Sequence, residues 1–121
     1  MARLIEAPTR VPPAGHPPKT IDEFVGRVNT GTAELSVARM VSPTGWSEPA
    51  QTPEFTEMTL VLRGAIHVET PAGTLRVGAG QAIITEPGER VRYSSPEEGG
   101  AEYFAVCWPA FSPDTVHREA D

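Results

Sequence analysis

The carboxylate of Glu57 is the group in this chain best placed for chemistry. Alternate residues of a strand share one face, so the strand predicted over 57–64 puts Glu57 beside Thr59 and Val61. A carboxyl group among small and apolar neighbours has its pKa raised by desolvation. Such a group suits general acid or base catalysis near neutral pH, so we predict that Glu57 is catalytic.

Glu57 also belongs to a regular pattern of spacings. A first frame that begins and ends on glycine has its defining positions at Gly45, Gln51, Pro53, Glu57 and Gly64. A second frame follows after one predicted hairpin, with its positions at Gly80, Glu86, Gly88, Val91 and Ser95. These frames resemble the two signature motifs of the cupin superfamily. The resemblance implies an all-β, single-domain jelly-roll barrel (a double-stranded β-helix) whose interior is lined by the face that carries Glu57.

The metal ligands of cupins are largely replaced in this chain. In metal-dependent cupins two histidines and a glutamate of the first motif and one histidine of the second hold the ion. The resemblance places these four ligands at Gln51, Pro53, Glu57 and Val91. One carboxylate and one neutral amide are a poor set for a transition metal, so we expect no metal and no other cofactor. The less favoured alternative is an atypical site at Glu57 with Gln51, completed by Glu48, Glu54, Tyr93 or Cys107.

Several further residues are predicted to surround Glu57. Tyr93 shares a strand face with Val91, so both are expected to point inward, and Tyr93 is the second catalytic candidate. Gln51 and Tyr93 are predicted to orient a ligand through hydrogen bonds. The other ligand-binding candidates are Pro53, Trp46, Thr59, Val91 and Cys107. The alternative is that Glu57 is only structural and is hydrogen-bonded to Tyr93 or Gln51.

Length, charge and cysteine content narrow the classes of function. The chain has 121 residues, which is a single-domain length, and its net charge of −6 argues against nucleic acid as a partner. No apolar run is long enough to span a bilayer, and the amino terminus lacks the apolar region of a secretory signal. The single cysteine, Cys107, cannot form an internal disulfide. These features predict a cytoplasmic protein with no nucleic-acid or membrane partner, and the barrel that the resemblance implies would take a small-molecule ligand.

The pattern along the chain predicts an arm followed by a barrel. Residues 1–19 form a proline-rich arm, either a loose tail or a segment that packs across a second subunit in a homodimer, and residues 20–121 form the barrel. Thr20 and Glu23 have the spacing of a capping box, which predicts a helical turn over 20–25. Strands are predicted over 34–41, 57–64, 65–69, 74–77, 81–86, 91–95 and 101–110.

The last predicted strand bears on function. The missing histidines, the retained glutamate and the closing run YFAVCWPA are similar to the cupin of bacterial ethanolamine-utilisation operons. That resemblance implies a homodimeric barrel, a cavity with glutamate and tyrosine, and a link to acetate or acetyl-phosphate metabolism. Two classes of function therefore stay open. One is a metal-independent isomerase, lyase or cyclase that uses Glu57, and the other is a ligand-binding or sensing barrel without turnover.

Overall fold

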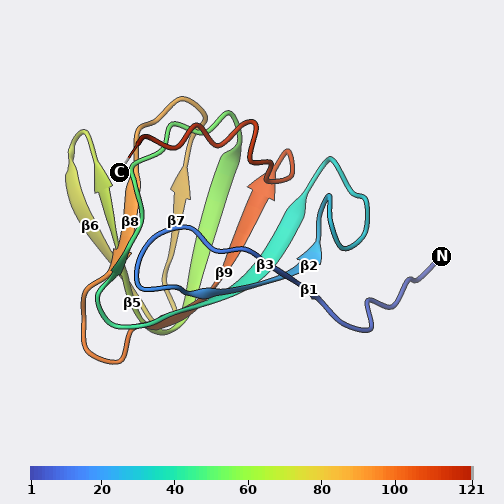
Figure 1. The fold of residues 1–121 in the computed structure, drawn as a ribbon, viewed down its shortest axis with the longest axis horizontal. Coiled ribbons are helices and arrows are strands. Elements are labelled where there is room, and N and C mark those ends of the chain that lie inside the picture. Colours follow the sequence, from blue (N-terminus) through green and yellow to red (C-terminus); the bar gives the residue numbers. More distant parts are fainter. Residues whose placement is uncertain (121) are drawn as a thin grey trace.

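The computed structural model describes residues 1–120, which form a curled antiparallel sheet with no helix in that range (Figure 1). The strands are β1 (Thr9–Val11), β2 (Thr20–Val25), β3 (Ser36–Ser42), β4 (Trp46–Ser47), β5 (Thr56–Thr70), β6 (Gly73–Gly78), β7 (Ala82–Thr85), β8 (Arg92–Ser95) and β9 (Ala101–Trp108). The predicted all-β barrel is confirmed.

Strand β5 is the centre of the sheet. Its first half pairs with β7 and β9, and its second half pairs with β6 and β8. The sequence predicted two strands here, over 57–64 and 65–69, and this was wrong because one strand of 15 residues bends without ending. The bend lies at Gly64, whose φ of 74° suits glycine and where a Cβ atom would collide with the carbonyl group of Gly100.

The inner face of the sheet follows the predicted alternation. Thr59 and Val61 of β5 are buried, whereas Leu62 is 48% exposed. Alternate residues of β9 are buried in the same way, at Ala101, Tyr103, Ala105 and Cys107. The predicted inward face of Glu57 is therefore confirmed as the interior face of the barrel.

The predicted helical turn over 20–25 was wrong, because this segment is strand β2 and pairs with β3. Glu23 does accept backbone hydrogen bonds, but from Val28 N–H (2.9 Å) and Asn29 N–H (2.7 Å) further along the chain. Its carboxylate thus stabilises the loop after β2 instead of the start of a helix. A capping box requires the glutamate to reach back to the cap residue, and here it reaches forward.

The proline-rich segment lies along its own barrel (Figure 1). Strand β1 pairs with β2, and its register places Thr9 opposite Glu23. Further on, His16 and Ser47 exchange two backbone hydrogen bonds, of 2.9 and 3.0 Å. Residues 9–16 therefore cover one side of the barrel, while Leu4 before them is 81% exposed.

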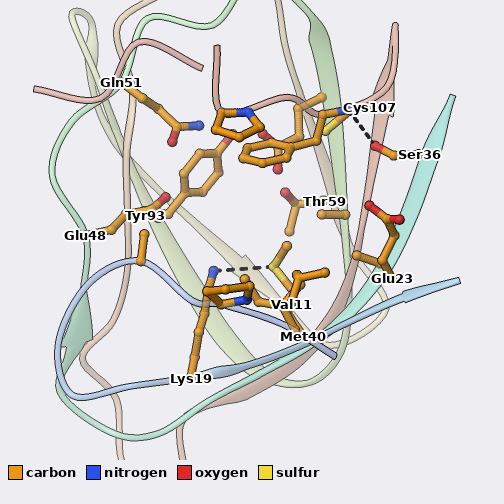
Figure 2. A pocket seen from close by; sticks show the side chains of 18 of the residues that line it. Val11, Lys19, Glu23, Ser36, Met40, Glu48, Gln51, Thr59, Tyr93 and Cys107 are labelled. Carbon is orange, nitrogen blue, oxygen red and sulfur yellow. Dashed lines mark hydrogen bonds between the residues drawn. The ribbon is translucent and has the colours of Figure 1, made fainter. Parts of the chain in front are cut away.

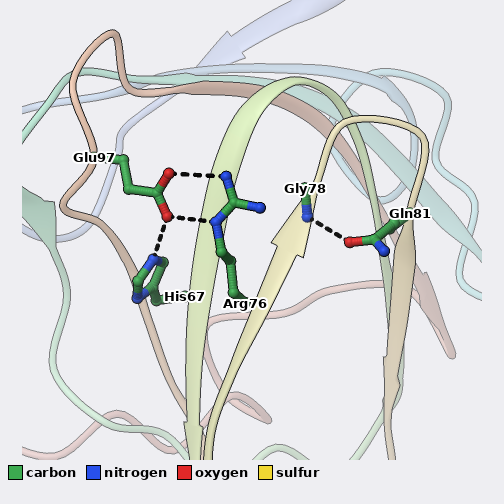
Figure 3. Close-up of polar contacts among 5 residues, drawn as sticks. All are labelled: His67, Arg76, Gly78, Gln81 and Glu97. Atoms are coloured by element: carbon green, nitrogen blue, oxygen red, sulfur yellow. Dashed lines mark hydrogen bonds and ion pairs between the residues drawn. The ribbon is translucent and has the colours of Figure 1, made fainter.

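A cluster of charged side chains fixes the loop between β8 and β9 (Figure 3). The Glu97 carboxylate accepts two hydrogen bonds from Arg76, of 2.7 and 2.9 Å, and lies 2.7 Å from His67 Nε2. The hydrogen bonds of Arg76 and then of His67 lower the pKa of Glu97 to about 2. This cluster joins the loop to the β5–β6 hairpin.

We predict that Glu97→Gln lowers the melting temperature at neutral pH. The folded-state pKa is depressed, so the stabilisation is present above the ordinary value of 4.5 and is lost as pH falls through about 2. Thermal unfolding followed by circular dichroism over this range tests the prediction. The matched control is Glu98→Gln, since Glu98 is the exposed neighbour in the same loop. Equal melting temperatures for the wild type and Glu97→Gln at neutral pH would contradict the role given to Glu97.

Candidate functional site

The barrel encloses a cavity of about 440 Å³ (Figure 2). Its walls come from the inner faces of β2, β3, β5, β8 and β9, and the amino-terminal segment closes one side through Arg10, Val11, Pro12 and Ala14. Most of the exposed lining area is apolar, and charged and polar side chains contribute the rest. This combination is typical of a small-molecule site.

Glu57 lies in the wall of this cavity and is half-buried. Its carboxylate takes part in none of the hydrogen bonds or ion pairs found among residues 1–120. From the sequence, Tyr93 was a possible hydrogen-bond partner of Glu57. Its hydroxyl is instead hydrogen-bonded to Thr85 Oγ1 at 3.1 Å. Burial raises the pKa of Glu57 to about 7, and the negative charge of Glu48 adds to this effect. Glu57 can therefore gain or lose a proton near neutral pH.

Glu48 is a second carboxylate in the same cavity. It is 5% exposed, and its Oε2 atom has no hydrogen-bond partner in the described part of the chain. The nearest cationic atom is Arg118 Nη2 at 3.7 Å, which is an ion-pair distance but too long for a hydrogen bond. Burial raises the pKa of Glu48, while the charges of Lys19 and Arg118 lower it. Two carboxylates with raised pKa values thus share one cavity.

Gln51 is held at the cavity by its backbone. Its N–H donates to Val91 O at 2.8 Å, and its carbonyl oxygen accepts from Val91 N–H at 2.9 Å. The side chain lines the cavity, and its Oε1 atom is buried without a partner among residues 1–120. The two sequence frames therefore meet in space at Gln51 and Val91, as the resemblance implied.

Lys19 is a cavity residue that the sequence analysis missed. It is 7% exposed, and its Nζ atom lies 3.2 Å from Tyr103 Oη and 3.3 Å from Met40 Sδ. It was missed because the arm was taken to end at residue 19 and the next segment was predicted as helical. If 20–25 is instead treated as a strand, Lys19 shares an inward face with Ile21 and Glu23, and all three line the cavity.

The structure brings together five of the eight predicted site residues. Those that line the cavity are Glu57, Tyr93, Gln51, Thr59 and Cys107. Burial raises the pKa of the Cys107 thiol, and Cys107 also packs in an apolar cluster with Phe55 and Val116.

The other three, Trp46, Pro53 and Val91, are buried behind the lining. Trp46 belongs to the core, where its indole N–H donates to Ala14 O at 3.0 Å, so it does not cover a barrel mouth. Val91 packs in the same core, and the Pro53 carbonyl oxygen accepts from Gly88 N–H at 2.8 Å.

The donor set does not fit a transition-metal ion. Of the four positions that hold the metal in cupins, Pro53 and Val91 have no donor side chain. Within residues 1–120 no three His, Cys, Asp or Glu side chains gather closely enough to hold a metal ion. Glu48 and Cys107 share the cavity with Glu57 without completing such a group. The polar groups that the chain itself places in this cavity include two carboxylates, an amide, hydroxyls and the Lys19 ammonium.

We predict that Glu57→Gln stabilises the fold at alkaline pH. Because the folded-state pKa of about 7 lies above the ordinary 4.5, the native state holds more protons between these values, and the wild type loses stability as pH rises through them. The full effect is at most about 3 kcal/mol, and solvent screening of this half-buried group reduces it. Chemical unfolding should show the gain at about pH 8 and none at about pH 4.

The matched control for this prediction is Glu86→Gln, which removes an exposed carboxylate from the turn after β7. It should leave the pH dependence of the unfolding free energy unchanged. If Glu57→Gln shows the same pH dependence as the wild type, the raised pKa of Glu57 is contradicted.

Sequence similarity connects the chain to one longer protein. It is 45% identical over 101 residues to endoribonuclease YbeY of Myxococcus xanthus. The match covers 84% of this chain and 34% of that protein, so the chain spans about a third of the length of this relative. No protein-family model matches the chain.

Solved structures with the same fold are more distant in sequence. The polyketide cyclase RemF from Streptomyces resistomycificus is 20% identical, with a TM-score of 0.73 over all of this chain and 87% of its own. A variant of Streptomyces PAC13, solved with uridine, is 15% identical, with a TM-score of 0.75 over 98% of this chain and 90% of its own. The EutQ protein of Clostridium difficile is 15% identical, with a TM-score of 0.66 over 85% of this chain and 74% of its own.

Proposed function

We propose that this chain, which has the fold of the cupin superfamily, is a metal-independent enzyme for a small molecule. In this proposal Glu57 moves a proton within the barrel cavity, and the reaction is an isomerisation, an elimination or a cyclisation. The observation that carries the proposal is the Glu57 carboxylate, which has no hydrogen-bond partner among residues 1–120, faces the cavity and has a pKa of about 7.

The chemical step follows from this setting. With a pKa of about 7, Glu57 is present in both ionised and protonated forms around neutral pH, so the group can take a proton from a bound substrate and return it at another atom. Such transfers need no redox partner, which is why the three reaction types fit. The neighbouring charge of Glu48 keeps Glu57 basic enough to accept a proton.

Tyr93 and Gln51 are proposed to orient the substrate. Burial raises the pKa of Tyr93 well above its ordinary value, and the charge of Glu57 raises it further, so the phenol stays neutral. Its hydroxyl, already bonded to Thr85, can still bond one substrate oxygen. The Gln51 amide lies across the cavity from Lys19 (Figure 2) and offers a second polar contact.

The structural relatives support a substrate with a ring. One of them is named a polyketide cyclase, and another was solved with uridine. The cavity of about 440 Å³ is large enough for a molecule of that size. We propose a compact cyclic substrate on this basis.

A generic proton-transfer probe tests the proposed chemistry. Nitrobenzisoxazole is a flat aromatic whose C–H proton passes to a base as its N–O bond breaks and a coloured phenolate forms. We predict that the wild type accelerates this reaction above buffer and that the rate rises with pH through about 7, as Glu57 ionises. Glu57→Gln should lose at least about tenfold of the enzyme-dependent rate.

Glu48→Gln is the matched comparison for this experiment. It removes the neighbouring negative charge, so the rise in rate should move to lower pH while the acceleration persists. A wild-type rate equal to that of buffer, or equal rates for the wild type and Glu57→Gln, would contradict a usable base at Glu57.

A ligand-sensing barrel without turnover is the second candidate. This candidate is favoured by the longer relative that is named an endoribonuclease. About a third of that protein is a sequence 45% identical to this chain. A domain joined to further sequence in this way can bind a ligand and act on a neighbouring activity. Ligand binding that persists while nitrobenzisoxazole is left unchanged would support this candidate over the enzyme.

A link to acetate or acetyl-phosphate metabolism stays a proposal, supported by likeness of fold to EutQ.

No helix among the described residues is long and apolar enough to cross a membrane. A cytoplasmic location also stays a proposal.

We also propose that the barrel forms a homodimer through the outer face of β5, β7 and β9. Leu62 is 48% exposed and Ile84 is 55% exposed on this face, close to partly exposed Phe104. Ile84→Glu should convert the dimer to a monomer in light scattering, whereas Leu4→Glu, at an exposed site in the arm, should not. A monomeric mass for the wild type would contradict this proposal.

A further inference from the structure

Lys19 is a buried cation without a carboxylate partner. No Asp or Glu oxygen of residues 1–120 lies within ion-pair distance of its Nζ atom. Its contacts are the Tyr103 hydroxyl at 3.2 Å, the Met40 sulfur at 3.3 Å and the face of Trp46, whose ring centroid is 4.0 Å away. A thioether and an aromatic ring compensate a buried ammonium poorly, so the Tyr103 hydroxyl is the one strong acceptor among these three contacts.

Tyr103 fixes the position of the Lys19 ammonium. Its hydroxyl oxygen accepts from Lys19 and is also 2.7 Å from Ser42 Oγ, so the phenol and the ammonium are fixed relative to one another. Both side chains are almost fully buried and both line the cavity. Together they form a rigid corner with donors for one oxygen of a ligand.

Glu48 and Glu57 in the same cavity feel the charge of Lys19, but neither carboxylate forms an ion pair with it in the described part of the chain. Glu23 is satisfied by two backbone N–H groups, and Arg10 is paired with Asp22 at 2.9 Å. Arg27 lines the cavity and forms no ion pair with the described residues. The chain as a whole carries a net charge of −6, so a cationic corner inside it is a local feature and not an average property.

We propose that the cavity selects an organic anion with an apolar body, whose charged oxygen binds between Lys19 and the Tyr103 hydroxyl. The apolar body would contact the inner walls, at Val11, Ile21, Met40, Ala105 and Phe111. A carboxylate, an enolate or a phenolate has the required oxygen. The inference rests on the proposed binding of a small molecule in the barrel, and it does not require Glu57 to transfer a proton.

This assignment also suits the proposed chemistry. When a base removes a proton next to a carbonyl group, negative charge develops on the oxygen, and a nearby ammonium stabilises that charge. Figure 2 shows Lys19 on the far side of the cavity from Gln51, with Tyr93 and Thr59 between them. Lys19 would then hold the oxygen while Glu57 acts on a neighbouring atom.

A matched pair of probes tests the selectivity. Naphthoate and naphthamide share one apolar body and differ in charge, and their dissociation constants can be measured by isothermal titration calorimetry near neutral pH. We expect the wild type to bind naphthoate at least about tenfold more tightly than naphthamide, as a buried charge-assisted contact implies. Lys19→Met, which keeps the length of the side chain without its charge, should lose this preference.

The control is Arg3→Met, which removes one positive charge from the exposed arm and should keep the preference. Near-UV circular dichroism checks that Lys19→Met is folded. A Lys19 side-chain amine signal that moves in NMR with naphthoate and not with naphthamide gives the same answer in the wild type.

Each of the other outcomes contradicts either the anion selection, the small-molecule site or the role given to Lys19. Equal affinity for both probes contradicts the selection of an anion but is consistent with a small-molecule site in the cavity. If neither probe binds, both the anion selection and the small-molecule site are contradicted. A preference that persists in folded Lys19→Met means that Lys19 only offsets the carboxylates across the cavity. In that case the variant should raise the pKa of Glu57 without changing the preference, because the charge of Lys19 lowers that pKa.

Discussion

The cavity exists because one long strand, β5, forms hydrogen-bonded pairs in both halves of the barrel. Strand β5 pairs with β7 and β9 before Gly64 and with β6 and β8 after it, so its bend closes the sheet. Gly64 and Gly100 approach so closely that a side chain at Gly64 would clash with the backbone of its neighbour. Any residue with a Cβ atom there would push the bend of β5 away from the turn that precedes β9.

Once the sheet is closed, the balance of charges within it decides what the site can do. Desolvation favours the neutral forms of Glu48 and Glu57, and the positive charge of Lys19 opposes this effect for both. Because Lys19 makes no ion pair with either carboxylate, Glu57 is left near the middle of its titration at neutral pH. Because no carboxylate is paired with it, the Lys19 ammonium is also available to bind a ligand. The proposed acid–base chemistry and the proposed anion selection thus have one physical origin.

The sequence was sufficient to predict the barrel, the inward face of Glu57, and the cavity positions of Gln51 and Tyr93. Strand alternation and the two glycine frames carry that information locally. It was not sufficient for Lys19, because the side chain reaches the cavity only through the pairing of β2 with β3, and Thr20 and Glu23 imitate a helix start. Trp46 could not be assigned for a similar reason, since its burial depends on the amino-terminal segment folding back over it.

The most direct test of the account is the pKa of Glu57, measured by NMR from the pH titration of its side-chain carboxyl carbon, with Glu57→Gln used to assign the signal. We predict a midpoint at about 7, far above that of exposed carboxylates in the same spectrum. A midpoint near the ordinary value of 4.5 would show that Glu57 is well solvated or paired, and the central claim would then be wrong.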